Sequence, residues 1–256
     1  MYRKIQEILD LLEKREGFRI LFAVESGSRA WGFSSPDSDY DVRYVYVRPA
    51  AEYLRVDPLR DTVEGPLDDV MDFAGWDLRK FLELLHRSNP SLMEWVHSPI
   101  VYRRSPRWDA VAAAVPGYFD PRSNLHHYLS MCRQDLTRHL PGEQVKVKKY
   151  LYVLRSILCG RWLEREGTLP PEAFRELMKV LPEQWQSTAE HLLELKTTSD
   201  EVLWTDRIPE LNAWLESEHA RLMAVAAAMA GKDPGGYEEL NALFRETLAR
   251  TWEETL

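Results

Sequence analysis

The sequence predicts an α+β fold, in which a domain with a mixed sheet and flanking helices precedes an all-α C-terminal domain. Two runs, near residues 19–25 and 41–48, are rich in the β-branched and aromatic residues that strands favour. After residue 124 the apolar residues recur at helical spacing instead. Prolines interrupt the chain between these two patterns, so we expect one domain over 1–110 and a second over 111–256.

The first domain is expected to begin with an amphipathic helix over 1–16. The two strands follow, and then a hairpin-like pair around 61–73 and a helix over 77–87. Asn89-Pro90 starts a further short helix through Trp95. This dipeptide is either a functional sequence motif or a helix N-cap followed by proline at the first helical position. We favour the N-cap.

The second domain is predicted to be helical throughout. The expected helices span 123–140, 144–166, 171–180, 182–196, 208–231 and 236–254. No internal repeat or low-complexity tract interrupts them.

Composition and charge exclude several classes of protein. The 256 residues carry a net charge of −8, which argues against broad, unspecific binding of duplex nucleic acid. The longest apolar run, over 222–230, is far shorter than the roughly 20 residues that span a bilayer. We therefore expect a cytoplasmic protein with no membrane role.

Neither the cysteines nor the histidines show metal-ligand spacing. Cys132 and Cys159 lie too far apart for a zinc motif and are expected to be reduced thiols. His126 and His127 are adjacent, so their side chains would point to different sides of a helix. A zinc site is therefore not expected.

The stretch GSRAWGFSSPDSDYD, residues 27–41, carries the candidate chemistry. A phosphate-binding P-loop would need lysine where this chain has Phe33. A calcium loop would need glycine and glutamate where it has Val42 and Arg48. Both readings are set aside, and a nucleotidyltransferase site remains.

Acidic residues at alternate positions indicate a cation site. On a strand, Asp39 and Asp41 share one face with Cα atoms about 7 Å apart, and two such carboxylates repel unless a cation joins them. Mg²⁺, or Mn²⁺, suits these oxygen ligands, and two ions would serve a nucleotidyl transfer. For the third acid we favour Asp72, which apolar residues flank on both sides, over Asp68 and Asp69 near a turn signal.

Gly27 and Ser28 follow the first predicted strand. A small residue there lets backbone N–H groups approach phosphate, and the serine hydroxyl adds a donor. A plain strand-to-helix turn would explain the pair equally well. The acids that follow favour the phosphate-binding interpretation.

The pattern GSRAWG…SDYD, followed by an acid on a later strand, resembles the DNA polymerase β-type nucleotidyltransferase superfamily. With the later blocks GWDLRKFLELL, SNPSLMEW and KVKKYLYVLR, the chain is similar to the RNA-ligase-associated predicted nucleotidyltransferases, also called YcgL-like or RlaP-type, as far as residue 165. The resemblance implies a polymerase β-like domain. It also implies that Asp39, Asp41 and Asp72 are catalytic metal ligands and that Gly27 and Ser28 grip the triphosphate.

Three residues of one predicted helix, and one arginine near the acids, are further candidates for nucleotide binding. Lys148, Tyr152 and Arg155 fall on one side of a predicted helix at spacings of four and three, as a clamp for triphosphate or acceptor would. A solvated face paired with acidic neighbours remains the alternative. Arg43 would point to the same face of the strand as Asp39 and Asp41. It would orient a carboxylate, meet phosphate or form a plain surface ion pair.

The expected function is Mg²⁺-dependent transfer of a nucleoside monophosphate from an NTP, with ATP as the default, to a hydroxyl. The acceptor would be an RNA end, in RNA repair, or a protein hydroxyl. The alternative is a non-catalytic module that binds NTP or RNA ends and assists an RNA ligase.

Overall fold

The protein is represented by a computed structural model, which describes residues 1–65, 70–200 and 202–252. The chain forms two units. The first comprises residues 1–30, 39–119 and 233–256, and the second comprises residues 31–38 and 120–232.

A five-stranded mixed sheet forms the centre of the first unit, with strand order β3-β4-β2-β1-β5. β2 runs parallel to β4, while β1 runs antiparallel to β2 and to β5. The strands are β1 (Arg19–Glu25), β2 (Tyr40–Val47), β3 (Thr62–Glu64), β4 (Met71–Asp77) and β5 (Val101–Arg104). The expected hairpin is present, because β3 pairs antiparallel with β4.

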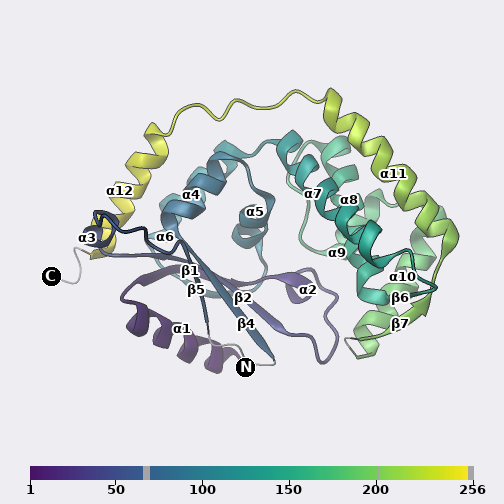
Figure 1. The fold of residues 1–256 in the computed structure, drawn as a ribbon, viewed down its shortest axis with the longest axis horizontal. Coiled ribbons are helices and arrows are strands. Elements are labelled where there is room, and N and C mark those ends of the chain that lie inside the picture. The colour runs from purple at the N-terminus through teal and green to yellow at the C-terminus, as the bar shows by residue number, and fades with distance from the viewer. Residues whose placement is uncertain (66–69, 201, 253–256) are drawn as a thin grey trace. The chain divides into compact units, whose positions relative to one another are not determined.

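Helices cover both faces of this sheet (Figure 1). Ile5, Leu9 and Leu12 of the first helix are fully buried in a cluster with side chains from the strands. On the other face Trp108 stacks on Phe22. The helices of this unit are α1 (Tyr2–Glu16), α2 (Gly27–Ala30), α3 (Ala50–Tyr53), α4 (Leu78–His86), α5 (Pro90–His97), α6 (Trp108–Ala114) and α12 (Glu238–Trp252), with a 3₁₀ turn at Val115–Tyr118.

Two helix starts of this unit carry side-chain caps. The side chain of Asp77 accepts from the amide of Arg79 at the start of α4. Asn89 caps α5 by accepting from the amide of Ser91, and proline occupies the first turn. The cap interpretation of Asn89-Pro90 is therefore confirmed.

The second unit is mostly helical but not all-α, which corrects the prediction. Gln144–Lys146 (β6) pairs antiparallel with Trp204–Asp206 (β7), so α8 begins at Val147 rather than at 144. A β-branched, buried Val145 suits a strand, and its partner lies some sixty residues away where local patterns cannot show it. The helices are α7 (Pro121–His139), α8 (Val147–Glu166), α9 (Phe174–Leu177), α10 (Glu183–Thr198) and α11 (Pro209–Ala228), with a 3₁₀ turn at Met178–Val180.

Two segments join a different unit from the one expected. Helix α12 belongs to the first unit, where the indole of Trp252 donates to the carbonyl of Arg48 (3.0 Å). Residues 31–38 belong to the second unit although the strands on either side belong to the first. β5 and α6 were also not predicted, because prolines and charged residues mask their patterns.

Candidate active site

Two acids and an arginine meet at one end of the sheet. The parallel register pairs Asp41 of β2 with Asp72 of β4, so the two acids lie side by side. Arg43 donates from Nη2 to Asp41 Oδ1 (3.0 Å) and to Asp72 Oδ2 (2.7 Å). The arginine side chain is 18% exposed, and those of Asp41 and Asp72 are 31% and 52% exposed. The two carboxylates therefore share one cation at an accessible edge.

Gly27 lies against the carboxylate of Asp41. Its φ of +63° is in the left-handed region, which favours glycine. A methyl group on its Cα would overlap Asp41 Oδ2. The preceding amide, that of Ser26, donates to the carbonyl of Asp41 (2.8 Å). Glycine is thus required here by backbone conformation and by the proximity of the acid.

Ser28 lies in α2, a single helical turn, and is nearly buried. This helix begins at Gly27 and ends at Ala30. A single turn carries little of the macrodipole of a full helix. Binding of a phosphate here would therefore depend on individual backbone amides and on the Ser28 hydroxyl. The nucleotide-binding role of Gly27 and Ser28 stays a prediction.

Asp39 directly precedes β2, and its backbone is fixed by an arginine. Arg29 donates from Nε to the carbonyl of Asp39 (3.0 Å), and its guanidinium lies 3.8 Å from the ring centre of Tyr40. Among the described residues, no group of three or more His, Cys, Asp or Glu side chains is arranged to hold a metal ion. The joint role of Asp39, Asp41 and Asp72 as ligands therefore stays a prediction.

The donor set at Asp41 and Asp72 nevertheless fits Mg²⁺ or Mn²⁺. Mg²⁺ is usually bound by one or two carboxylates and completes its octahedron with water and substrate phosphate, so a preformed three-acid cage is not needed. Here the two carboxylates already converge on a positive charge, that of Arg43. Binding of a metal by this pair would require the guanidinium to release them.

Sequence reasoning missed Glu25, the last residue of β1. It is fully buried; its Oε1 accepts from the amide of Asp41 (2.8 Å) and its Oε2 accepts from the hydroxyl of Tyr102. Burial raises the pKa of the Glu25 carboxyl. An acid at the end of the apolar run RILFAV, two residues before Gly27, was the available signal.

In the second unit, two of the three predicted clamp residues contact Trp31. The guanidinium of Arg155 lies 4.2 Å from the Trp31 ring centre and 3.3 Å from Glu172 Oε2, and the residue is only 4% exposed. Tyr152 meets the same indole edge-on, at 5.6 Å between ring centres. Arg155 is thus not on an exposed ridge, because Trp31 and Glu172, distant in sequence, cover that side of the helix. The nucleotide-binding roles of Lys148, Tyr152 and Arg155 stay predictions.

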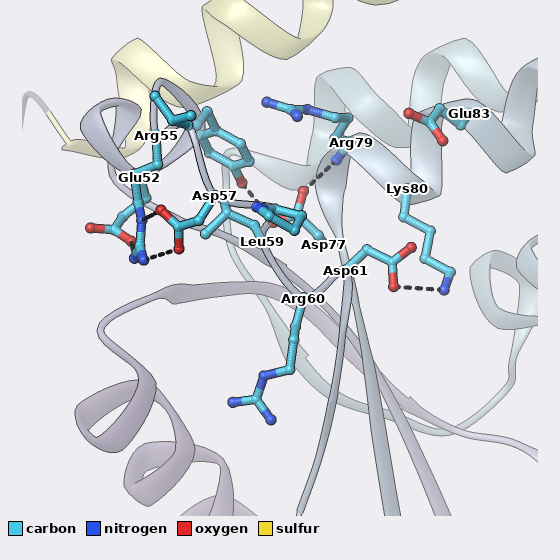
Figure 2. A pocket seen from close by; sticks show the side chains of 13 residues that line it. Glu52, Arg55, Asp57, Leu59, Arg60, Asp61, Asp77, Arg79, Lys80 and Glu83 are labelled. Atoms are coloured by element: carbon cyan, nitrogen blue, oxygen red, sulfur yellow. Dashed lines mark hydrogen bonds and ion pairs between the residues drawn. The ribbon is translucent and has the colours of Figure 1, made fainter.

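A charged pocket of about 320 Å³ lies at the other end of β4 from Asp72, beside Asp77. Figure 2 shows the ammonium of Lys80 in contact with the carboxylate of Asp61. Arg55 likewise pairs with both Glu52 and Asp57. Two of the cations of this pocket are therefore paired with acids that line the same pocket.

The remaining candidates are two acids and two cysteines. Asp68 and Asp69, the alternatives for the third acid, lie outside the described residues. Cys132 and Cys159 are buried free thiols, and burial raises the pKa of Cys132 to about 12, so it stays protonated. No described helix combines the length and apolar character that crossing a bilayer requires.

Comparison with known proteins places the chain in a family. A family model described as "RNA repair pathway DNA polymerase beta family" matches residues 1–246. A protein of Bacillus subtilis (strain 168), described as "Uncharacterized protein YcgL", is 38% identical over 257 residues, which cover 99% of each chain. The chain therefore belongs to the RNA repair pathway DNA polymerase beta family.

Proposed function

We propose that the protein is a nucleotidyltransferase that moves a nucleoside monophosphate from an NTP to a hydroxyl and releases pyrophosphate. The observation that carries this proposal is the pairing of Asp41 with Asp72 on neighbouring parallel strands, next to the strand end that carries Gly27. Membership of a polymerase β-like family supports the same reaction class.

The proposed roles follow from position. Asp41 and Asp72, with Asp39 as the third ligand, would hold two Mg²⁺ or Mn²⁺ ions. A divalent cation bound there would neutralise phosphate charge and favour ionisation of the acceptor hydroxyl. Backbone amides around Gly27, with the Ser28 hydroxyl, would donate to the β and γ phosphates. Arg43, once released by the acids, would lie within reach of a phosphate oxygen.

The chemical step is an in-line displacement. The acceptor oxygen forms a bond to the α-phosphorus, and the bond from that phosphorus to the bridging oxygen of the β-phosphate breaks. The bond's electron pair leaves with pyrophosphate. The acceptor's proton passes to Asp72, the most exposed of the Asp41, Arg43 and Asp72 side chains. Arg43 and the amides near Gly27 would balance the charge that develops on the phosphates.

Labelled transfer tests the proposal. The protein is incubated with Mg²⁺ and each of the four α-labelled NTPs, with RNA fragments or a cell lysate as acceptor. We expect label to enter an acceptor, and we expect Asp41→Asn and Asp72→Asn to abolish that transfer. Transfer of label that persists in both variants would contradict the proposal.

The acceptor is proposed to be an RNA end, because the family description names an RNA repair pathway. A protein hydroxyl is the competing acceptor. Mass spectrometry of lysate proteins for an added nucleotide would distinguish the two, since an RNA acceptor leaves the proteins unmodified.

A second candidate is a module that binds NTP or RNA ends without turnover and assists an RNA ligase. The double ion pair of Arg43 favours it, because an arginine already occupies the position between the two acids. Calorimetry separates the candidates. Tight NTP binding, unchanged by Mg²⁺ and without transfer to any acceptor, would favour the module.

A further inference from the structure

Residues 31–38 link the two halves of the candidate motif and are packed into the helical second unit. Phe33 is fully buried, and its ring meets that of Phe174 edge-on at 5.5 Å. The amide of Phe174 donates to the carbonyl of Trp31 (3.0 Å). The chain before this segment carries Gly27, and the residue directly after it is Asp39. The helical unit therefore fixes the connection between them.

The end of the segment is a turn closed by two serines and a lysine. Ser38 donates from its amide to the carbonyl of Ser35 (3.2 Å), and the amide of Ser35 donates to Ser38 Oγ (2.9 Å). The ammonium of Lys196, from α10, lies 2.7 Å from Ser35 Oγ and 3.3 Å from Ser38 Oγ. Lys196 is fully buried, and each serine is at most 3% exposed.

Such a lysine is costly for the fold. Moving an ammonium out of water costs several kcal/mol even after relaxation, and an apolar side chain of similar volume often stabilises such a site more. Lys196 is therefore poorly explained as core packing. Its ammonium donates to both hydroxyls of one turn, and Asp39 follows that turn directly in the chain.

We propose that Lys196 is a positioning residue for the candidate site: it fixes the turn at residues 35–38 and thereby places Asp39. This inference rests on the proposed function, because it assumes that Asp39 binds a divalent cation. It assigns Lys196 no contact with substrate. Its effect on the site would pass through Ser35 and Ser38.

The test compares Lys196→Met with the wild-type protein. Methionine keeps the length and apolar stem but removes the charge and the donors. We expect the amides of Ser35 and Ser38 to exchange hydrogen at least about tenfold faster in the variant. We also expect Mn²⁺ affinity, measured by electron paramagnetic resonance with a non-hydrolysable ATP analogue, to fall about tenfold, as when support of a metal ligand is lost.

Controls separate positioning from folding. Lys179→Met removes an exposed lysine of the same unit and should change neither readout. In urea, Lys196→Met should be as stable as the wild type or more so. If it fails to fold, the double change Ser35→Ala and Ser38→Ala decides, since it keeps the lysine and is expected to lower Mn²⁺ affinity similarly.

The inference is overturned if Lys196→Met keeps wild-type exchange at Ser35 and Ser38, or keeps wild-type Mn²⁺ affinity in a protein that binds Mn²⁺. Failure of the proposed function looks different. In that case the wild-type protein itself binds no Mn²⁺ with the analogue, while the exchange rates, which need no metal, still decide whether Lys196 holds the turn.

Discussion

Asp41 and Asp72 are held in place differently from residues 31–38, the segment that precedes Asp41 in the chain. Asp41 and Asp72 are neighbours because two strands pair in parallel, so their proximity is a property of the sheet. Residues 31–38 take their shape from side chains of the helical unit, such as Phe174 and Lys196, more than 130 positions along the chain. The comparison shows that the acid pair depends on strand pairing, whereas the segment before it depends on contacts with residues distant in sequence.

The largest expected effect is that of replacing the paired acids on the sheet. Asp41→Asn and Asp72→Asn should each lower nucleotide transfer about 10³-fold or more, because each removes a carboxylate that holds the divalent cations in the proposed site. The double variant should be hardly worse than either, since groups that act together are not additive. The measurement is initial rates of label transfer.

Asp61→Asn is the matched control, because Asp61 is an exposed acid paired with Lys80 at the other end of the sheet. It should transfer label at the wild-type rate. Equal losses in all three single variants would show that the paired acids have no special role.

The next effect concerns the anchored segment. Phe33→Ala should lower the free energy of unfolding by about 3–5 kcal/mol, because it empties a fully buried aromatic position. Phe33→Leu fills most of that space and should cost clearly less. Urea unfolding followed by circular dichroism measures both. Equal stability of the alanine variant and the wild type would mean that residues 31–38 are not anchored.

Two glycines with the same backbone conformation differ in their surroundings. Gly27 and Gly167 have nearly the same φ, +63° and +64°, but only at Gly27 would a new methyl group meet another side chain. Gly167→Ala should therefore cost about 1–2 kcal/mol, the left-handed penalty alone. Gly27→Ala should cost more in thermal unfolding and should also lower label transfer, because it displaces the carboxylate of Asp41. Equal costs would contradict the close approach seen at Gly27.

The smallest effect is a pH dependence at Glu25. Its folded pKa lies above the unfolded value of about 4.5, so the folded state holds the proton more tightly. The contribution of Glu25 to stability is therefore fully present below the unfolded pKa and is lost as pH rises through the folded one. Glu25→Gln should lack this loss, so its stability relative to wild type should increase across that window in urea titrations at successive pH values. A constant difference would contradict the assignment.

Local patterns predicted much of the first unit. The run of Val and Tyr after Asp41 predicted β2, and apolar flanks on both sides placed Asp72 on a strand. Asn89-Pro90 predicted a capped helix start. These features depend on residues within a few positions of one another, where strand alternation and capping chemistry apply.

The remaining features depend on contacts between distant residues. Arg155 has the spacing of an exposed cation, yet Trp31 and Glu172 bury it. Lys196 lies in the last turn of α10, and nothing near it in sequence indicates a serine turn as its partner. Strand β6 has its partner only in β7. Such pairings are set by the tertiary fold, which the sequence pattern does not encode locally.

The most direct test of the central claim is a crystal structure with a non-hydrolysable ATP analogue and Mn²⁺, recorded with anomalous scattering. We predict an anomalous peak about 2.1 Å from carboxylate oxygens of both Asp41 and Asp72, with Arg43 moved onto a phosphate. Bound analogue with no peak at these acids, and with Arg43 still joining them, would contradict it.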